Sequence, residues 1–255
     1  MKKKDDKFAA TAEFYHHRPV YSPEAVAWLV DQLHLDGRGR MLDVGCGTGH
    51  VCFAFPGKFA RIVGIDPSPQ MLAKAEVIAR ERRLRGYSFR QLRAEDLPAD
   101  LGTFRLITFG NSFHRTERGR VAEIIYDMIE PDGGLGLLFT SVPWRGDTAW
   151  KAALRERVKV WAGTDLGGAL GEPSQNVIRS SRFGDWVECN FREDHVWSAA
   201  DLVGFLQSTS FCSPLVLGAR RLDFERDMTA HLLAVQPNDN FRETLETVVV
   251  LAVKR

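Results

Sequence analysis

Short apolar runs alternate with segments of helical spacing through the middle of the chain. The runs, rich in Ile, Val, Leu and Phe, predict strands at residues 40–45, 60–66, 87–93, 104–110 and 134–141. Between them, amphipathic spacing predicts helices from about Thr48, from about Pro69 to Arg83 and from about Arg118 to Ile129. Apolar strands separated by helices indicate a parallel sheet that is covered on both faces. The pattern therefore predicts an α/β fold with a Rossmann-like, doubly wound sheet.

Segments outside this alternation are expected to cover and complete the sheet. Two amino-terminal helices are predicted, at Phe8 to His17 and at Pro23 to Leu33, with Ser22 as the N-cap of the second. Ala149 to Trp161 has helical spacing, whereas residues 162–175 are Gly-rich and irregular. Later segments have strand or helical patterns and should complete the same sheet with an antiparallel last strand; they are residues 185–191, 198–208 and 247–255.

We therefore expect a single domain over residues 1–255, divided into four parts. An amino-terminal helical cap covers 1–39, a core covers 40–143, a lid insertion covers 144–185, and residues 186–255 complete the sheet. The lid is expected over the carboxyl ends of the strands, where open α/β sheets bind their ligands.

Composition and charge exclude several classes of protein. Of the 255 residues, 44% are hydrophobic and 26% are charged, and the formal net charge is +1. So small a charge gives no overall field that would recruit nucleic acid or an anionic membrane, and neither partner is expected. The sequence has no signal peptide and no apolar run of about 18 residues, so a cytoplasmic protein is expected.

The cysteines and one basic run could suggest a metal site and RNA binding, but a structural role is the preferred interpretation of both. The four cysteines lie far apart without a C-x-x-C pair, so no metal site is expected and the thiols are interpreted as reduced. The basic run from Arg80 to Arg93 has Tyr87 and Phe89 among its arginines, a pattern that could bind RNA phosphates. However, the run passes from a helix end into a strand, so its side chains should diverge, and helix carboxyl ends favour arginine. We therefore prefer a structural role for this basic run over RNA binding.

Three glycines at alternate positions follow the first predicted strand, in the stretch "MLDVGCGTGH". Gly45, Gly47 and Gly49 have the spacing G-x-G-x-G, which differs from the G-x-G-x-x-G of dinucleotide-binding loops, and no Walker motif is present. Because glycines have no side chain, a bulky ligand can lie against the backbone at the carboxyl end of this strand.

Two acidic residues at strand ends add to this loop. Asp43 lies near the end of the first strand, where a carboxylate can face a cationic group. Asp66 closes the second strand, 17 residues after Gly49, and an acid there can accept hydrogen bonds from both hydroxyl groups of a ribose. The pair fits adenosine with a positively charged, amine-bearing tail better than it fits a dinucleotide.

Four motifs follow one another in this region: "LDVGCGTGH", "GIDPSPQML", "AEDLP" and "FRLITFGNSFHR". In order and spacing they resemble those of the class I S-adenosylmethionine-dependent methyltransferases. "LDVGCGTGH" is similar to their first motif, "GIDPSPQML" to the acidic second motif, "AEDLP" to the third, and "FRLITFGNSFHR" to the strand and loop that lead to the substrate. The agreement extends over roughly residues 40–143. The resemblance implies S-adenosylmethionine as cofactor and S-adenosylhomocysteine as product.

The resemblance also implies roles for individual residues. The three glycines would lie under the methionine part of the cofactor, bordered by Asn111 and Ser112, and Asp66 would bind the ribose hydroxyls. Contacts with the adenine are implied for four residues: Met71, Glu95, Asp96 and Leu97.

The amino terminus is similar to one subgroup of these enzymes. "FYHHRPVYSPEAVAWL" resembles the Y-x-x-x-R-P-x-Y-P helix of the subgroup of trans-aconitate and ubiquinone type, which acts on small molecules, and "DLVGFLQSTS" resembles its late helix. Tyr15 and Arg18 would then close over the cofactor, with Arg18 as a partner of its carboxylate.

Methyl transfer from a sulfonium is an in-line displacement, so the protein must hold nucleophile, methyl and sulfur collinear at about 3 Å. An oxygen nucleophile of high pKa needs a general base, whereas a carboxylate needs none. His114 follows the fourth predicted strand by a short loop and is the candidate base; alternatively it hydrogen-bonds the loop or packs against Phe113. His16 and His17 are interpreted as structural or solvent-facing.

We therefore predict an enzyme that methylates a small molecule, at oxygen. The alternative is a cyclase or binding protein of the same fold that holds the cofactor without transferring the methyl; a nicotinamide oxidoreductase, which would bind NAD, is a third candidate. The acceptor and the oligomeric state are left open by the sequence. Five tryptophans are expected mostly in the core, with some lining an acceptor pocket: Trp144, Trp150, Trp161, Trp186 and Trp197.

Overall fold

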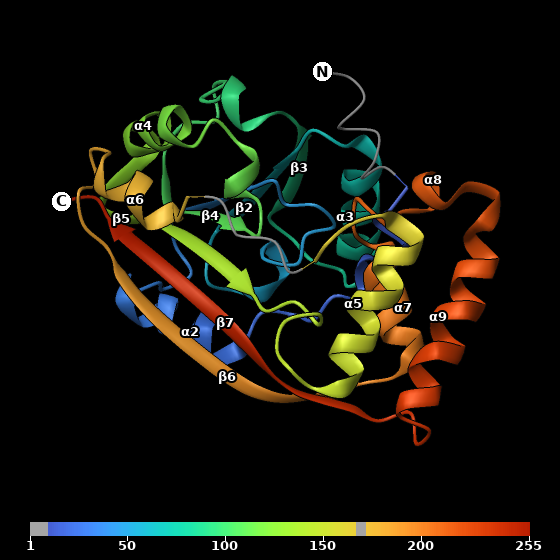
Figure 1. Cartoon of the computed structure of the whole chain (residues 1–255). Coiled ribbons are helices and arrows are strands. Elements are labelled where there is room, and N and C mark those ends of the chain that lie inside the picture. The colour runs from blue at the N-terminus through green and yellow to red at the C-terminus, as the bar shows by residue number, and fades with distance from the viewer. Residues whose placement is uncertain (1–9, 167–171) are drawn as a thin grey trace. The chain divides into compact units, whose positions relative to one another are not determined.

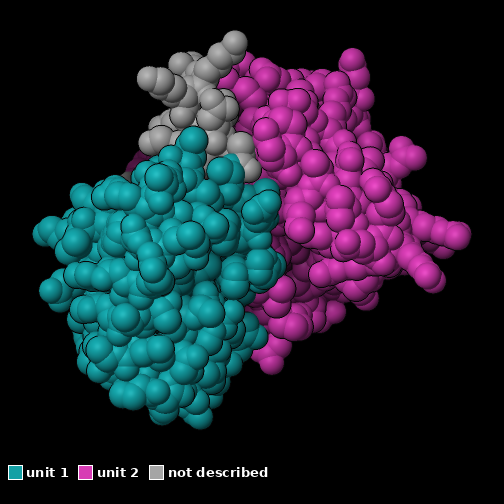
Figure 2. Space-filling view, turned by 90° about the vertical axis from the view of Figure 1, so that its right-hand side faces the viewer, with its two compact units in different colours: residues 1–19, 141–170, 192–245 teal, residues 20–140, 171–191, 246–255 magenta. Residues whose placement is uncertain are grey.

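The structure, a computed structural model, describes residues 10–166 and 172–255. The chain divides into two compact units, coloured separately in Figure 2. Unit 1 comprises residues 1–19, 141–170 and 192–245, and unit 2 comprises residues 20–140, 171–191 and 246–255. The segment 144–185, predicted as one lid insertion, is therefore divided between the units, and its action as a lid stays a prediction.

A seven-stranded sheet of the described residues includes every strand of unit 2 (Figure 1). Its order is β3-β2-β1-β4-β5-β7-β6; β1 to β5 pair in parallel, and β7 is antiparallel to β5. The predicted Rossmann-like sheet with an antiparallel last strand is confirmed. The strands are β1 (Arg40–Val44), β2 (Arg61–Asp66), β3 (Tyr87–Gln91), β4 (Phe104–Gly110), β5 (Ile129–Thr140), β6 (Val187–Trp197) and β7 (Phe241–Val253).

The strand order reverses direction at the centre of this sheet. The chain moves outward from β1 through β2 to β3, and then returns to the other side of β1 with β4. At such a switch point the loops after two neighbouring parallel strands turn away in opposite directions and leave a crevice at the carboxyl ends. The loops after β1 and β4 therefore define the place where unit 2 can hold a ligand.

Helices cover both faces of the sheet because successive residues of a strand point to opposite sides. On one face, Met41 packs with Leu29 of α2 (Pro23–Gln32) and Leu72 of α3 (Pro69–Glu81). On the other face, Leu42 packs with Ile125 of α4 (Arg118–Met128), together with α6 (Ser174–Arg179). Strand pairing and these two apolar layers fix the crevice between β1 and β4 in place.

The helix predicted from about Thr48 is wrong in type. Residues 48–51 form turns, followed only by the 3₁₀-helix η2 (Cys52–Ala54). Phe55, which precedes Pro56, is at φ −112° and ψ 54°, outside the helical region. A residue before proline is disfavoured in the α conformation, so the chain between Gly49 and Pro56 is too short for a regular helix.

The amino-terminal helices are confirmed in part. Pro23–Gln32 is the predicted α-helix, and Ser22 stands at its N-cap, but the Ser22 side chain makes no capping hydrogen bond. Instead the Ser22 backbone N–H donates to Thr247 Oγ1 at 3.3 Å. The first helix is the 3₁₀-helix η1 (Ala12–His17), while Phe8 and Ala9 lie outside the described residues.

Unit 1 has its own apolar core, in which Trp150 packs edge-on against Phe241, and Trp197 against Phe205. Around it lie α5 (Ala149–Ala162), α7 (Ala199–Gln207), α8 (Pro214–Leu217), η5 (Gly218–Arg220) and α9 (Arg221–Val235). The predicted helices at α5 and α7 are confirmed, whereas α6, α8 and α9 were missed. No helix of the described residues is long and apolar enough to cross a bilayer.

Candidate functional site

The glycine loop follows β1 at the switch point, and its backbone has a conformation that suits glycine. Gly45, Gly47 and Gly49 have φ angles of +69°, +53° and +91°. A Cβ on Gly45 would lie 2.7 Å from Ser112 Cβ, and one on Gly49 would lie 2.6 Å from the Phe53 ring. At these two positions glycine is thus required by the protein's own packing, a reason that sequence reasoning, which considered only the ligand, did not include.

Asp66, at the carboxyl end of β2, is bound to this loop. Its Oδ2 accepts a hydrogen bond from the Gly47 N–H at 2.9 Å, and its Oδ1 accepts one from the Ser68 N–H at 2.8 Å. The two backbone donors fix the orientation of this carboxylate. The first and second motifs therefore form one unit in which the carboxylate can bind paired hydroxyl groups.

The residues expected at the adenine differ in exposure. Met71, in the first turn of α3, and Leu97 are buried at 2% and 5% exposure. Glu95, in η3 (Ala94–Asp96), accepts a hydrogen bond from the Glu117 N–H at 3.1 Å, which joins it to the start of α4. Asp96 is exposed. Of the two acids, Asp96 is therefore the more accessible, and adenine contact stays a prediction for all four residues.

The loop after β4 carries the residues predicted beside the methionine moiety. Asn111 has φ +51°, and its Nδ2 donates to Thr140 Oγ1 at 2.9 Å and to the Tyr21 hydroxyl at 3.3 Å. Ser112 Oγ donates to the Val44 carbonyl at 2.6 Å. These bonds hold the ends of β1, β4 and β5 together, so the loop has a fixed place next to Gly45.

Asp43 is a buried carboxyl beneath the glycine loop, with 1% of its surface exposed. Its Oδ1 accepts a hydrogen bond from Thr108 Oγ1 at 2.9 Å, and its Oδ2 accepts one from Cys52 Sγ at 3.4 Å. Burial raises the pKa of Asp43 to about 7, and these hydrogen bonds offset only part of that effect. A direct contact with a cationic group, as expected from the sequence, stays a prediction.

The thiols beside Asp43 are held in the neutral form. A hydrogen bond with Cys46, followed by burial, raises the pKa of the Cys52 thiol, and burial raises the pKa of Cys46. All four cysteines are free, as expected for reduced thiols. Within the described residues, no group of three or more His, Cys, Asp or Glu side chains could hold a metal ion.

His114 lies in the 3₁₀-turn η4 (Phe113–Arg115), on the carboxyl side of β4 where the sequence placed it. Desolvation, followed by the positive charges of Arg115 and Arg118, lowers the pKa of His114 to about 4. The imidazole is therefore neutral near pH 7 and can accept a proton or a hydrogen bond. Phe113 itself is buried and packs edge-on against Phe109, with ring centroids 5.0 Å apart.

Tyr15 and Arg18 belong to unit 1, whereas the residues above belong to unit 2. Arg18 Nε donates to Ser208 Oγ at 2.8 Å, and Nη2 donates to the Ser208 carbonyl at 2.9 Å. The guanidinium also lies 4.5 Å from the centre of the Tyr15 ring. Within unit 1, Arg18 thus joins η1 to the end of α7, and its role toward a cofactor carboxylate stays a prediction.

The arginines of the basic run have separate partners. Arg82 lies over the Phe53 ring, Arg90 donates to the Ala99 carbonyl at 2.9 Å, and Arg93 pairs with Glu95 at 3.5 Å. The side chains of the run therefore diverge, as predicted for a run that passes from a helix end into a strand.

Comparison with known proteins finds similarities in sequence and in fold. Residues 41–133 match a family described as "Methyltransferase domain". The crystal structure of the YcgJ protein from Bacillus subtilis has a similar fold, with a TM-score of 0.56 and 16% identity over 91% of this chain and 98% of that one. The fold is that of the Rossmann-like methyltransferases.

Two relatives are similar in sequence over most of this chain. The uncharacterized methyltransferase Rv3342 of Mycobacterium tuberculosis is 24% identical over 96% of this chain and 93% of its own length. A yeast protein named a probable S-adenosylmethionine-dependent methyltransferase, CRG1, is 26% identical over 69% of this chain and 64% of its own. Like the domain match, both similarities are to proteins named as methyltransferases.

Two further similarities involve proteins of other named activity. A tRNA U34 carboxymethyltransferase of Hahella chejuensis is 32% identical over 42% of this chain and 34% of its own length. The structure of the [4+2]-cyclase SpnF has a TM-score of 0.52 and 22% identity over 91% of this chain and 80% of that one. The fold alone therefore does not specify the acceptor.

Proposed function

We propose that the protein transfers the methyl of S-adenosylmethionine to a small molecule, at an oxygen atom, by in-line displacement. The observation that carries the oxygen acceptor is the position of His114, an imidazole in the turn just past β4 on the carboxyl side of the sheet. A neutral imidazole at the carboxyl side of the sheet can orient an acceptor hydroxyl and accept its proton. The net charge of +1 favours a small molecule over a polyanion.

The residues of unit 2 fit the cofactor. When bound, S-adenosylmethionine supplies an electrophilic methyl group on a sulfonium. Asp66, oriented by the Gly47 and Ser68 amides, would accept the ribose hydroxyls, and the glycine loop would support the methionine part. Met71 and Leu97 provide apolar surface, and Asp96 an exposed carboxylate, toward the adenine. In this proposal the amino-terminal motif with Tyr15 and Arg18 supports the trans-aconitate and ubiquinone subgroup.

The cofactor assignment is tested by Asp66→Ala. The charged acceptor of two hydrogen bonds donated by the ribose hydroxyls is lost, so we expect S-adenosylmethionine to bind at least about 10-fold more weakly in calorimetry. Asp36→Ala is the matched control, because Asp36 is an exposed aspartate of unit 2 whose side chain bonds to nearby Arg38, accepting its backbone N–H at 2.9 Å and lying 3.7 Å from its guanidinium. Unchanged affinity in the Asp66 variant would contradict the assignment, as would preferential binding of NAD by the wild type.

The acceptor class is tested by measuring S-adenosylhomocysteine formation with a panel of carboxylic acids, phenols and sugars. Turnover with a hydroxyl compound that falls strongly in His114→Gln supports an oxygen acceptor with a base. Turnover with carboxylic acids that does not change in His114→Gln would support an oxygen acceptor that needs no general base. Turnover with a tRNA transcript and with none of the small molecules would contradict the small-molecule proposal.

A second candidate function is a cyclase or binding protein that keeps the cofactor without consuming it. The fold similarity to the cyclase SpnF supports it. This candidate predicts tight S-adenosylmethionine binding with no S-adenosylhomocysteine while the true substrate is converted. The same product assay therefore separates the two functions.

A further inference from the structure

Three of the connections along which the chain passes between the two units are joined to one another by residues of unit 2. The chain enters unit 2 at residue 20, leaves it after residue 140 and enters it again at residue 246. Thr140 and Thr247 lie opposite each other in the antiparallel pair of β5 and β7, which Figure 1 shows side by side. The Ser22 N–H donates to Thr247 Oγ1 at 3.3 Å. The three connections therefore meet at one place, although they are far apart in the sequence.

The side chain of Asn111 binds two of these three connections directly. Its Nδ2 donates to Thr140 Oγ1 at 2.9 Å and to the Tyr21 hydroxyl at 3.3 Å, and its Oδ1 accepts a hydrogen bond from the Thr140 N–H at 3.3 Å. An amide nitrogen carries two N–H donors, so it can make both bonds at once. We call this group of five residues the asparagine junction: Tyr21, Ser22, Asn111, Thr140 and Thr247.

The backbone at the end of β4 permits these contacts. Asn111 has φ +51°, a left-handed conformation that asparagine adopts more readily than most residues. A Cβ on the preceding Gly110 would lie 2.5 Å from the Tyr21 hydroxyl oxygen, so the tyrosine reaches Asn111 because position 110 has no side chain. Tyr21 is 8% exposed, and Ser22 and Thr247 are each 3% exposed. Water therefore competes little for the hydrogen bonds of the junction.

The same asparagine belongs to the methyl-transfer site. In the proposed function, on which this inference rests, Asn111 and Ser112 border the methionine part of S-adenosylmethionine. The Ser112 side chain holds their loop to the Val44 carbonyl at 2.6 Å, next to Gly45. A ligand that binds against this loop would restrain Asn111 and, through its side chain, the connections to which that side chain is bonded.

We propose that the asparagine junction couples cofactor binding to the connections between the units. When the cofactor is bound, Asn111 is fixed and holds the segments around Tyr21 and Thr140; without the cofactor, these hydrogen bonds open more often. Because such coupling is reciprocal, breaking the junction weakens cofactor binding by the same factor by which the cofactor stabilises the junction. Tyr21 and Thr140 are thus positioning residues, which act on the cofactor site through Asn111.

Hydrogen exchange of the full-length protein tests this coupling, with S-adenosylhomocysteine as the probe. The amide protons of Ser22 and Thr140 are the reporters, because each donates a hydrogen bond within the junction. A saturating probe should slow their exchange at least about fivefold, the equivalent of one hydrogen bond. Unchanged exchange at both amides, with binding of the probe seen by calorimetry, would overturn the coupling and leave the cofactor assignment intact. A wild type that does not bind the probe would contradict the proposed function and the coupling together.

Two substitutions break the junction by different routes. Asn111→Gly removes the amide and keeps a residue that adopts a positive φ, and Thr140→Val removes only a hydroxyl that lies outside the cofactor set. Each should weaken binding of the probe about fivefold and abolish its effect on the Ser22 amide. Thr140→Ser restores the hydroxyl and should behave as the wild type. Wild-type affinity in Thr140→Val would overturn the proposal.

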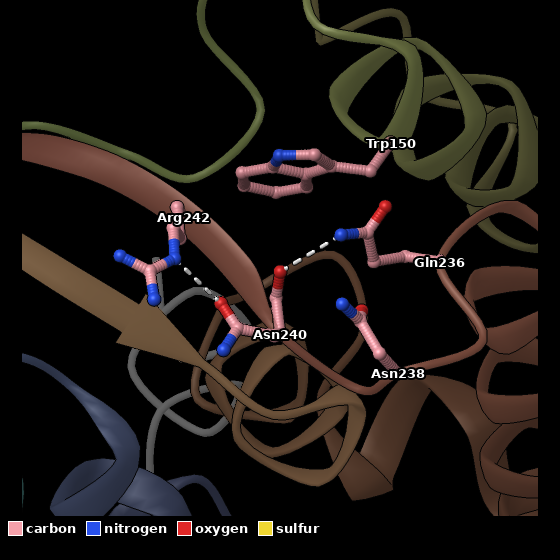
Figure 3. Close-up of a pocket in the computed structure, with 5 residues that line it drawn as sticks. All are labelled: Trp150, Gln236, Asn238, Asn240 and Arg242. Carbon is pink, nitrogen blue, oxygen red and sulfur yellow. Dashed lines mark hydrogen bonds between the residues drawn. The ribbon is translucent and has the colours of Figure 1, made fainter.

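Asn240→Gly is the matched control for the asparagine substitution. Asn240 lies in unit 1, and its Oδ1 accepts a hydrogen bond from Arg242 Nε at 3.0 Å (Figure 3), so this variant also loses a side-chain hydrogen bond. Its probe affinity and the exchange of both reporter amides should match those of the wild type. An effect as large as that of Asn111→Gly would show general destabilisation instead of coupling, and would overturn the proposal.

Discussion

At the scale of single residues, the buried carboxyl of Asp43 couples the stability of unit 2 to pH. Its pKa is raised to about 7, whereas an aspartate of an unfolded chain titrates near ~3.9. Between these values the folded protein holds a proton that the unfolded chain has released. The stability from this proton is therefore complete below pH ~4 and is lost as the pH rises through about 7.

Asp43→Asn removes this titration and keeps the shape of the side chain. The free energy of unfolding of the wild type should fall by about 2 to 3 kcal/mol relative to the variant between pH 5 and pH 8. Urea unfolding at several pH values measures it, with Asp36→Asn as the exposed control. Parallel pH profiles of wild type and Asp43→Asn would show that burial does not raise this pKa.

His114 leads to a prediction for catalysis that rests on its role as base. Because its pKa is about 4, the imidazole is neutral from pH 5 upward, so its titration causes no fall in kcat/KM between pH 8 and pH 5. His114→Gln should lower kcat by about 100-fold on a hydroxyl acceptor, and kinetics over this pH range measure both effects. A break in the wild-type profile near 6.5, absent from the variant, would show an unperturbed histidine and contradict the lowered pKa.

At the scale of elements, α5 and β7 are joined by a buried ion pair. Lys151 and Glu243 lie 2.5 Å apart with side chains exposed by 11% and 3%, and the Trp197 indole donates to the same carboxylate. Removing one partner leaves the other charge buried, which costs about 3 to 5 kcal/mol, whereas removing both costs much less.

Lys151→Met alone should therefore destabilise the protein by about 3 kcal/mol or more, and the double variant Lys151→Met with Glu243→Gln should recover most of that loss. Urea unfolding provides the free energies for this cycle. Arg226→Met is the control, because Arg226 and Asp223 are exposed and their ion pair contributes little. Additive effects of the two substitutions would show that the pair is not coupled.

At the scale of the whole molecule, the sequence predicts most of what depends on local pattern. Strands β1, β2 and β4 are largely apolar, and Gly45, Gly49 and Asp66 lie at or just after the carboxyl ends of β1 and β2, so these strands and motifs could be predicted directly. The α-helix predicted after the glycines does not form, because Pro56 follows too soon along the chain for a regular helix. The helix α9 was missed because Phe224, Met228 and Leu232 provide only about one buried apolar residue per turn.

Features that depend on distant segments could not be predicted. The bond from the Glu117 N–H to Glu95 spans 22 residues, and the Ser112 side chain that crowds Gly45 lies 67 residues away along the chain. Each of the two units combines three separate segments of the chain. The periodicity of hydrophobic residues does not predict which distant segments pack together.

The order of the strands also has a consequence for how the protein behaves at high concentration. In the sheet of the described residues, β3 and β6 are the outermost strands, and open backbone edges invite pairing with a second copy. The edge strand β3 is only five residues long, and β6 carries Glu188, Arg192, Glu193 and Asp194 along its 11 residues. Such charges hinder edge-to-edge aggregation, but salt screens them. We therefore expect samples to stay dispersed at low ionic strength and to aggregate more readily in concentrated salt.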